Sequence, residues 1–388
     1  MKSFVAQTII VIVCGFLFSL TPSIVSATDV VVEPEPVQRK YESGNIIRVL
    51  IVPGHDDEFS GAQYGSVVEA DLALSLGKKI VEKLSINPQF FVTITRNDEG
   101  YIPELSDYFL NNEKEIRAFI KDKKKKTARA IDTGKIIIED QITHNDAPSD
   151  VAYRLYAINK WASENKYDLI LHIHFNDYWP RSLATQGEYG GFTVYAPDQA
   201  LLNGVVSESF ADAIGSRLKK TWYPSNLPIE KQFSNEYGVV PDFKLIALGS
   251  NMTLSVPSIL VEYSYIYEPF LGREFFDETS TVMAQATTLG IFEYLQGYVY
   301  ESKNLSYEWT SLLSSSPKRK PDIIVLQYAL RELGMYPPAI PGKERCPISG
   351  IFGPCTKTAV QTFQKSQQLL ASGVLTPTTR TALNELFK

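Results

Sequence analysis

Residues 46–57, IIRVLIVPGHDD, are the stretch of sequence that decides the fold. A mostly apolar, β-branched run is followed by Pro53-Gly54, a pair that ends a strand and turns the chain. Apolar residues then recur at every fourth position, as on the buried face of a helix: Val68, Leu72, Leu76, Ile80 and Leu84. The stretch therefore predicts a buried strand, a loop that contains His55, and a helix.

The alternation of strand and helix continues to about residue 300. The segments with a strand pattern are 90–94, 169–173, 192–195 and 259–266. The segments with a helical pattern are 151–164, 203–222 and 279–298. Strands that alternate with helices favour a mostly parallel twisted sheet with helices on both faces. We therefore expect one α/β domain over residues 46–300.

Both ends of the chain depart from this alternation. Residues 1–27 combine a basic start, an apolar run and a small-residue cleavage pattern, which is typical of an export signal peptide; a retained membrane anchor is the alternative. Residues 28–45 and 301–320 have the composition of solvated linkers, and the second is expected to be a flexible tether. A further domain is expected at 321–388. We expect an exported protein of the periplasm, the cell wall or the extracellular space, with membrane contact only if the signal is retained.

The composition limits the partners. The 388 residues allow two or three domains, and a formal net charge of −6 is not typical of a chain that binds DNA or RNA. From residue 317 onward, ten basic residues stand against four acidic ones, which favours attraction to something anionic. Cys346 and Cys355 lie nine positions apart in an exported segment, so a local disulfide is expected; two separately buried thiols are the alternative.

Three of the four histidines fall at the ends of predicted strands. His55 follows the first strand, and His172 and His174 end the third. Residues just past the carboxyl ends of strands line the binding crevice of open α/β sheets, and Glu69 can return its carboxylate to the same edge. Two imidazoles and one carboxylate are the ligand set of a hydrolytic zinc. Taken singly, each residue is more simply explained as structural.

The two histidines of the third strand point to the same side of it, because they are two positions apart. His174 is nearer the strand's end and is the better ligand. His172 is then either a group that orients a ligand or a hydrogen-bonded core histidine.

These motifs resemble those of the zinc-dependent N-acetylmuramoyl-L-alanine amidases of the third amidase family. The matching positions are Gly54-His55, Gly61-Ala62, Gly65, Glu69-Ala70-Asp71-Leu72, Thr95-Arg96, Arg154, Asn159, Ile173-His174-Phe175-Asn176 and Leu260-Val261-Glu262. The resemblance implies one zinc ion per chain, with His55, Glu69 and His174 as ligands. It assigns Glu262 as the acid/base. The reaction implied is hydrolysis of the amide between the lactyl group of muramic acid and L-alanine of the peptidoglycan stem peptide.

Three positions depart from the family's pattern. Val52 stands where an aspartate is usual, Asp56-Asp57 replace two glycines, and His172 stands where a small residue is common. None removes a ligand. Arg154, Asn176 and His172 remain candidates for orienting a ligand or contacting the substrate.

The segment between Arg96 and Arg154 is longer than the resemblance predicts. We expect an insertion over about 100–148, with a charged helix near 113–129. It is either a lid over the crevice or a solvated surface helix. His144, at its return end, is a further candidate for contact with the site.

The tail resembles the small helical peptidoglycan-binding module that is often attached to wall hydrolases. The matching positions include Leu330, Leu333-Gly334, Gly350, Gly353, Phe363-Gln364 and Gly373-Val374-Leu375. This resemblance implies a small all-α domain at 321–388 and peptidoglycan as the partner. Two other functions remain open: an exported zinc peptidase acting on the stem peptide, and a non-catalytic wall-binding or activator protein.

Overall fold

The structure is a computed structural model that describes residues 36–138, 142, 144, 147–178, 180–297, 303–339 and 346–387. The described residues belong to one compact unit, Glu35–Lys388. The expected export signal lies outside the described residues. Within the described ranges, no helix combines the length and hydrophobicity that a bilayer-spanning segment needs.

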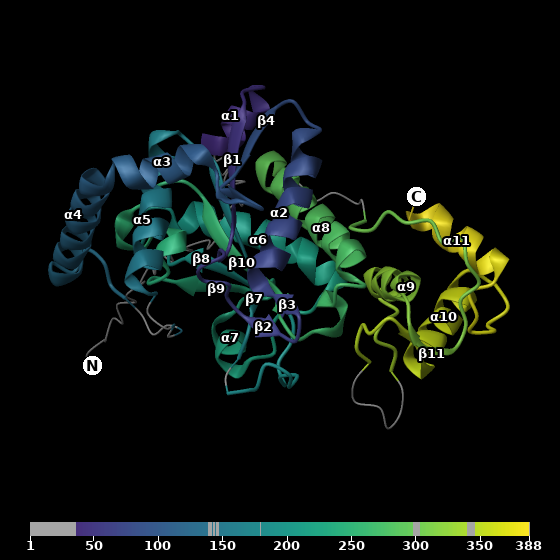
Figure 1. The fold of residues 1–388 in the computed structure, drawn as a ribbon. Coiled ribbons are helices and arrows are strands. Elements are labelled where there is room, and N and C mark those ends of the chain that lie inside the picture. The colour runs from purple at the N-terminus through teal and green to yellow at the C-terminus, as the bar shows by residue number, and fades with distance from the viewer. Residues whose placement is uncertain are drawn as a thin grey trace, which may run out of the picture. The chain divides into compact units, whose positions relative to one another are not determined.

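A six-stranded sheet forms the centre of the fold (Figure 1). In spatial order its strands are β4 (Phe90–Ile94), β1 (Ile47–Pro53), β7 (Leu169–Asn176), β10 (Ser258–Tyr265), β8 (Thr193–Pro197) and β9 (Val239–Asp242). Neighbouring strands are parallel except for β8 and β10, which are antiparallel. The expected mostly parallel sheet is therefore confirmed.

Helices cover both faces of this sheet. On one face α2 (Glu69–Ser85), α8 (Phe276–Gln296) and α6 (Gly204–Thr221) pack side by side. On the other face lies α5 (Ser149–Glu164), with α3 (Pro103–Asn111) and α4 (Glu113–Asp132) packed against it. Strand β1 is buried from both sides: Val49 and Ile51 join one hydrophobic cluster, and Leu50 and Val52 join another. This is why the strand is a continuous apolar run rather than an alternating one.

The remaining elements of this part of the chain are short. The helical ones are α1 (Pro36–Glu42), α7 (Pro228–Phe233), η1 (Ile246–Leu248), η2 (Ser250–Met252) and η3 (Pro269–Leu271). The short strands are β2 (Gln63–Tyr64), β3 (Val67–Val68), β5 (Arg96–Asn97) and β6 (Gly100–Tyr101).

The C-terminal region is mainly helical. It contains β11 (Ser316–Arg319), α9 (Pro321–Glu332), β12 (Ile351–Phe352), α10 (Pro354–Ser366) and α11 (Pro377–Phe387). β11 and β12 pair as a two-stranded ribbon, so the region is not purely α-helical. Cys346 and Cys355 form a disulfide, in the pairing that their spacing favoured.

The described parts of the two segments that were expected to be solvated linkers, 36–45 and 303–320, are packed in the structure. The end of the first, at 36–42, forms α1, which packs on α8 and buries Val37. In the second, Leu305, Trp309 and Leu313 are buried, and Trp309 stacks edge-on with Phe387 of α11. The expectation of a flexible tether was therefore wrong. It rested on the many serine and lysine residues of this segment, whereas the packing is directed by three large apolar residues that are spaced four positions apart.

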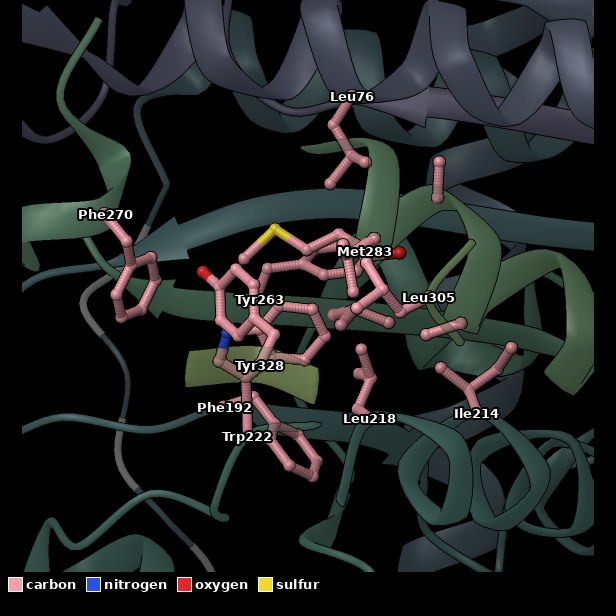
Figure 2. Close-up of a cluster of buried hydrophobic side chains, with 14 of the residues drawn as sticks. Leu76, Phe192, Ile214, Leu218, Trp222, Tyr263, Phe270, Met283, Leu305 and Tyr328 are labelled. Carbon is pink, nitrogen blue, oxygen red and sulfur yellow. The ribbon is translucent and has the colours of Figure 1, made fainter. Parts of the chain in front are cut away.

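The C-terminal region shares a core with the sheet domain (Figure 2). Tyr328 of α9 is fully buried, with its ring 5.2 Å from that of Trp222 and 6.3 Å from that of Phe270. Its hydroxyl lies 3.2 Å from Thr279 Oγ1 of α8. Asn304 Nδ2 donates to the carbonyl of Arg217 at 2.8 Å, which ties this part of the connecting segment to α6.

Candidate active site

Three elements of the fold bring His55, Glu69 and His174 together. His55 follows β1, Glu69 is the first residue of α2, and His174 lies near the end of the neighbouring strand β7. One potential ligand atom from each lies within 4.8 Å of the other two. The carboxyl ends of two adjacent parallel strands and one helix N-terminus thus bring the three candidate ligands together at one edge of the sheet.

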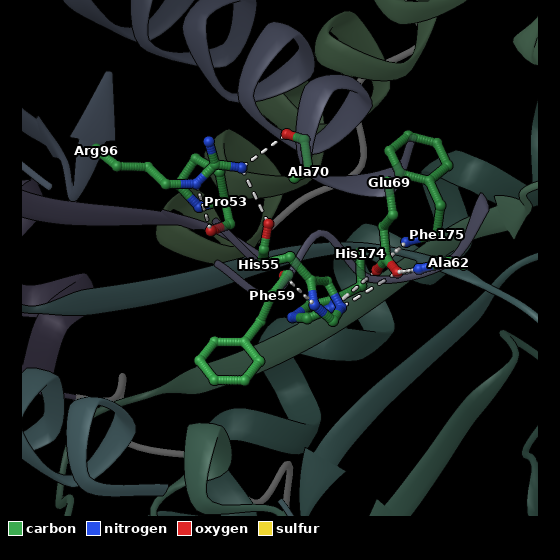
Figure 3. A network of polar contacts seen from close by, with 10 residues as sticks. Pro53, His55, Phe59, Ala62, Glu69, Ala70, Arg96, His174 and Phe175 are labelled. Atoms are coloured by element: carbon green, nitrogen blue, oxygen red, sulfur yellow. Dashed lines mark hydrogen bonds and ion pairs between the residues drawn. The ribbon is translucent and has the colours of Figure 1, made fainter. Parts of the chain in front are cut away.

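Glu69 contacts both imidazoles, as the dashed lines in Figure 3 mark. Its Oε2 is 3.1 Å from His55 Nε2, and its Oε1 is 3.0 Å from His174 Nδ1. The backbone N–H groups of Ala62 and Phe175 donate to the same two oxygens, at 2.8 and 3.1 Å. The other nitrogen of His55, Nδ1, lies 3.1 Å from the carbonyl of Phe59, which orients the ring. Backbone contacts therefore hold the donor atoms in a converging arrangement.

Two glycines leave the space that this cluster occupies. A Cβ at Gly54 would lie 2.3 Å from the His174 ring, and a Cβ at Gly61 would lie 2.4 Å from Glu69 Oε2. Gly61 also has a φ of +75°, a conformation that glycine adopts at little cost. His55 itself has a φ of +62°, which is uncommon for a residue with a side chain. The two imidazoles and the carboxylate, in this glycine-lined cradle, fit a metal ion.

The charges in the cluster support one another. Burial favours the neutral acid, but hydrogen bonds with His174 and His55 outweigh it and hold the pKa of Glu69 well below its ordinary value. Burial likewise acts against the charged form of His55, yet contact with Glu69 raises the pKa of that imidazole. At His174 burial dominates and the pKa is lowered. Neutral histidines and an ionised carboxylate are the forms that bind metal.

Glu262 lies beside the cluster on β10. It is the register partner of His174 across the β7–β10 pair, and its buried Oε2 has no hydrogen-bond partner among the residues that the structure describes. Burial, followed by the nearby carboxylates of Glu69 and Glu230, raises the pKa of Glu262 well above its ordinary value. The carboxyl group lines a cavity of about 560 Å³ together with His55, Glu69 and His174, which we call the catalytic cavity.

His144 reaches the same catalytic cavity from the return end of the insertion. Its Nε2 lies 2.9 Å from Asp242 Oδ2, and its ring is edge-on to Tyr195 at 5.2 Å. Asp242 is fully buried and accepts the backbone N–H groups of Lys244 and Leu245, both at 2.7 Å. His144 is therefore held by a fixed carboxylate.

The other candidate residues lie at the edges of the site. Asn176 lines the catalytic cavity and donates through Nδ2 to Glu230 at 2.9 Å. Arg154 donates to Asp56 Oδ2 at 2.7 Å and also pairs with Glu58. Arg154 and His172 line an adjoining cavity of about 250 Å³ that also touches His55 and His174.

His172 is a buried neutral histidine. It is 1% exposed, and burial together with nearby His174 lowers its pKa to about 3. Neither ring nitrogen has a hydrogen-bond partner among the described residues, so it is not hydrogen-bonded to Glu69. It does not join the three-residue cluster that fits a metal.

The two helices of the insertion stand apart from the catalytic cavity. The charged helix expected near 113–129 is observed as α4, preceded by α3. α3 and the loop at Asp56–Glu58 border another cavity, and α4 packs on α5. Of the described residues of the insertion, His144 is the one that lines the catalytic cavity.

Sequence reasoning missed a buried acidic group beside the site. Glu230 of α7 is 2% exposed and accepts from Asn176 Nδ2, from Thr193 Oγ1 at 3.0 Å and from the Tyr195 hydroxyl at 2.7 Å. The Tyr265 hydroxyl donates to it at 3.2 Å. The partners come from three different segments of the chain, so no local sequence signal marks this glutamate.

Comparison with known proteins gives matches to two families. A family profile described as N-acetylmuramoyl-L-alanine amidase matches residues 49–292, and one described as a peptidoglycan binding domain matches residues 319–383. No curated protein matches the chain.

Several solved structures resemble this chain. One is the CwlD amidase from Clostridioides difficile in complex with the GerS lipoprotein: 17% identity, 65% of this chain, 100% of that chain and a TM-score of 0.41. The amidase AmiC2 of Nostoc punctiforme is 20% identical over 64% of this chain and 97% of that chain, with a TM-score of 0.38. For the amidase Ami1 from Mycobacterium smegmatis, the identity is 16%, the coverage 66% and 100%, and the TM-score 0.42. Because the amidase profile spans more than half of its residues, the chain belongs to the N-acetylmuramoyl-L-alanine amidase family.

Proposed function

We propose that this protein is a zinc-dependent amidase that cleaves the bond between the lactyl group of muramic acid and L-alanine in peptidoglycan. The observation that carries the proposal is the convergence of His55, Glu69 and His174 beside a buried Glu262. Two imidazoles and a carboxylate suit one zinc ion and leave a coordination position open, as hydrolytic zinc sites require.

The residues divide the chemistry between them. Bound zinc would supply a Lewis acid that polarises the scissile carbonyl and lowers the pKa of a water molecule to about 7. Glu262 accepts a proton from the attacking water and delivers it to the departing amine. Its raised pKa makes the Glu262 carboxylate a stronger proton acceptor than an exposed glutamate.

Backbone contacts hold this arrangement before substrate arrives. The N–H groups of Ala62 and Phe175 fix the Glu69 carboxylate, and the Phe59 carbonyl fixes the tautomer of His55. His55 then presents Nε2 as its donor to the metal. Little reorganisation is required when the ion binds.

The C-terminal region supports action at the cell wall. Its match to a peptidoglycan binding domain makes peptidoglycan its partner, and an enzyme with this substrate acts outside the cytoplasm. Removal of residues 1–27 during export remains part of the proposal.

Mass analysis of muropeptides after digestion of purified sacculi tests the bond that is cut. Free stem peptide together with peptide-free glycan supports the amidase, whereas shortened peptides still attached to muramic acid support a stem-peptide peptidase. A zinc-loaded wild type that releases nothing from any wall preparation favours a non-catalytic wall-binding or activator protein.

A further inference from the structure

A second cavity, of about 380 Å³, lies where the sheet domain meets α9 and the disulfide-bonded loop. We call it the junction pocket. The sheet domain contributes residues 186–191, Trp222, Tyr223 and Ser264, and the C-terminal region contributes Arg331 and Cys346. The catalytic residues do not line it, and neither family match describes it.

The junction pocket carries a positive charge, Arg331, that has no acidic partner among the described residues. Arg331 is partly buried at the end of α9, with its guanidinium carbon 5.3 Å from the centre of the Tyr223 ring. Among the described residues, no carboxylate lies within ion-pair distance of Arg331, and the ionisable groups that act on it are tyrosines. Because a partly buried cation without a counter-charge is costly, the pocket suits an anionic group of a ligand.

A buried hydroxyl, that of Ser264, also lines the junction pocket. Ser264 is 1% exposed, and its Oγ has no hydrogen-bond partner among the described residues. Buried hydroxyl groups are usually satisfied, and an unsatisfied one loses the hydrogen bond that it would make with water. A polar ligand group in the pocket would supply that bond.

Glu268 and aromatic side chains complete the lining of the junction pocket. A Cβ at Gly190 would lie 2.4 Å from Glu268 Oε1 and 2.7 Å from the Tyr223 hydroxyl, so glycine lets both groups approach this point. Tyr189 and Phe270 add apolar surface. The lining therefore combines the Arg331 cation with aromatic surface, which suits a peptide that carries a free carboxylate.

The junction pocket is adjacent to the catalytic cavity along the chain. The loop after β7 lines the catalytic cavity with Asp177 and Leu183, and its continuation at 186–191 lines the junction pocket. Strand β10 likewise places Glu262 at one cavity and, two residues later, Ser264 at the other. A polymer held at one cavity therefore lies near the other.

We propose that the junction pocket binds a stem peptide of peptidoglycan, with Arg331 receiving a free carboxylate and Ser264 making a hydrogen bond to the bound peptide. The inference rests on the proposed function only in taking the cell wall as the substrate. It assigns the wall-peptide site to both domains together rather than to the C-terminal region alone.

Calorimetric titration of the full chain with a free stem tetrapeptide tests this assignment, since the peptide has no scissile bond and binding is read without turnover. We expect Arg331→Gln to weaken binding at least tenfold, because hydrogen bonds to charged groups are among the strongest. Lys365→Gln, which removes an exposed positive charge from the same domain, is the matched control and should bind as the wild type does.

Ser264→Ala separates binding from folding. If the hydroxyl is only structural, removing an unsatisfied buried group leaves affinity unchanged and thermal stability equal or higher. We expect instead a several-fold loss of affinity at undiminished stability. Unchanged affinity in both variants, as for a peptide that occupies only the catalytic cavity, overturns the proposal. So does equal, Arg331-dependent binding of a peptide-free disaccharide.

Hydrolysis of sacculi is measured separately and distinguishes the two proposals. If the enzyme is active but Arg331→Gln leaves the tetrapeptide affinity unchanged, the junction-pocket proposal is rejected and the amidase proposal stands. If the protein is inactive but its tetrapeptide affinity depends on Arg331, the amidase proposal is rejected and the junction-pocket proposal stands.

Discussion

Replacing Gly61 by alanine tests whether the glycine cradle holds the metal ligands in place. The new Cβ would lie 2.4 Å from Glu69 Oε2, whereas ordinary contact begins at 3.4 Å, so the oxygen must move by about 1 Å. Metal–ligand distances tolerate only about 0.2 Å. We therefore expect a loss of zinc affinity of about 10- to 100-fold, the usual effect of disturbing the groups that orient a ligand, which corresponds to about 1.4 to 2.8 kcal/mol.

Gly65→Ala is the matched control for this substitution. Gly65 also has a positive φ, +58°, but a Cβ there meets no atom within 4 Å. Both variants should lose about 1 kcal/mol of stability from the left-handed backbone, as measured by thermal unfolding without metal. Only Gly61→Ala should also lose zinc in a titration against a competing chelator. If its zinc affinity were within twofold of that of Gly65→Ala, the reasoning would be refuted.

Four further predictions follow from the site and the core. His174→Ala should abolish zinc binding by competitive titration while His172→Ala retains it, and the reverse result would show that the wrong histidine was assigned. Glu262→Gln should keep zinc by metal analysis but lower turnover at least about 100-fold, since the amide cannot accept a proton; near-normal turnover would reject its role. In the metal-free protein the pKa of Glu69 is lowered, so the ionised carboxylate stabilises the folded state above pH 4.5, the ordinary pKa of glutamate, and this contribution is lost as the pH falls further. Denaturant unfolding at several pH values should show the loss. A Glu69→Gln variant with the same dependence of unfolding free energy on acid pH would contradict it. Deleting 317–388 should destabilise the sheet domain by at least about 3 kcal/mol, because it strips buried aromatic contacts; an unchanged unfolding temperature would count against a shared core.

The central part of the fold and the candidate ligands could be predicted from sequence because their signals are local. His55 and His174 end apolar strand patterns, and parallel strands place their carboxyl ends at one edge. Glu69 begins a helix whose apolar stripe determines which side of the helix packs on the sheet. The disulfide was likewise indicated by a short spacing between two cysteines.

The residues that escaped prediction depend on contacts between distant segments. Glu230 is held by side chains from β7, β8 and β10, and Asp242 meets His144 across 98 positions of the chain. The composition of 301–320 also led to a wrong prediction. The segment is mostly polar, but Leu305, Trp309 and Leu313 are spaced four positions apart and are buried. Contacts of this kind are decided by tertiary packing, which no window of sequence contains.

The burial of Tyr328 against the sheet domain determines how the enzyme can work on an insoluble polymer. A catalytic domain on a flexible linker samples the volume around its anchoring domain and can cleave any bond within that volume. Here Asn304 and Trp309 anchor the part of the connecting segment that the structure describes, and α9 packs on the sheet domain, so the fold sets reach and orientation. Such an enzyme would cleave stem peptides at a constant offset from the strand that it grips. Replacing 317–388 by another anchoring module would therefore disturb the folding of the enzyme as well as the place where it binds in the wall.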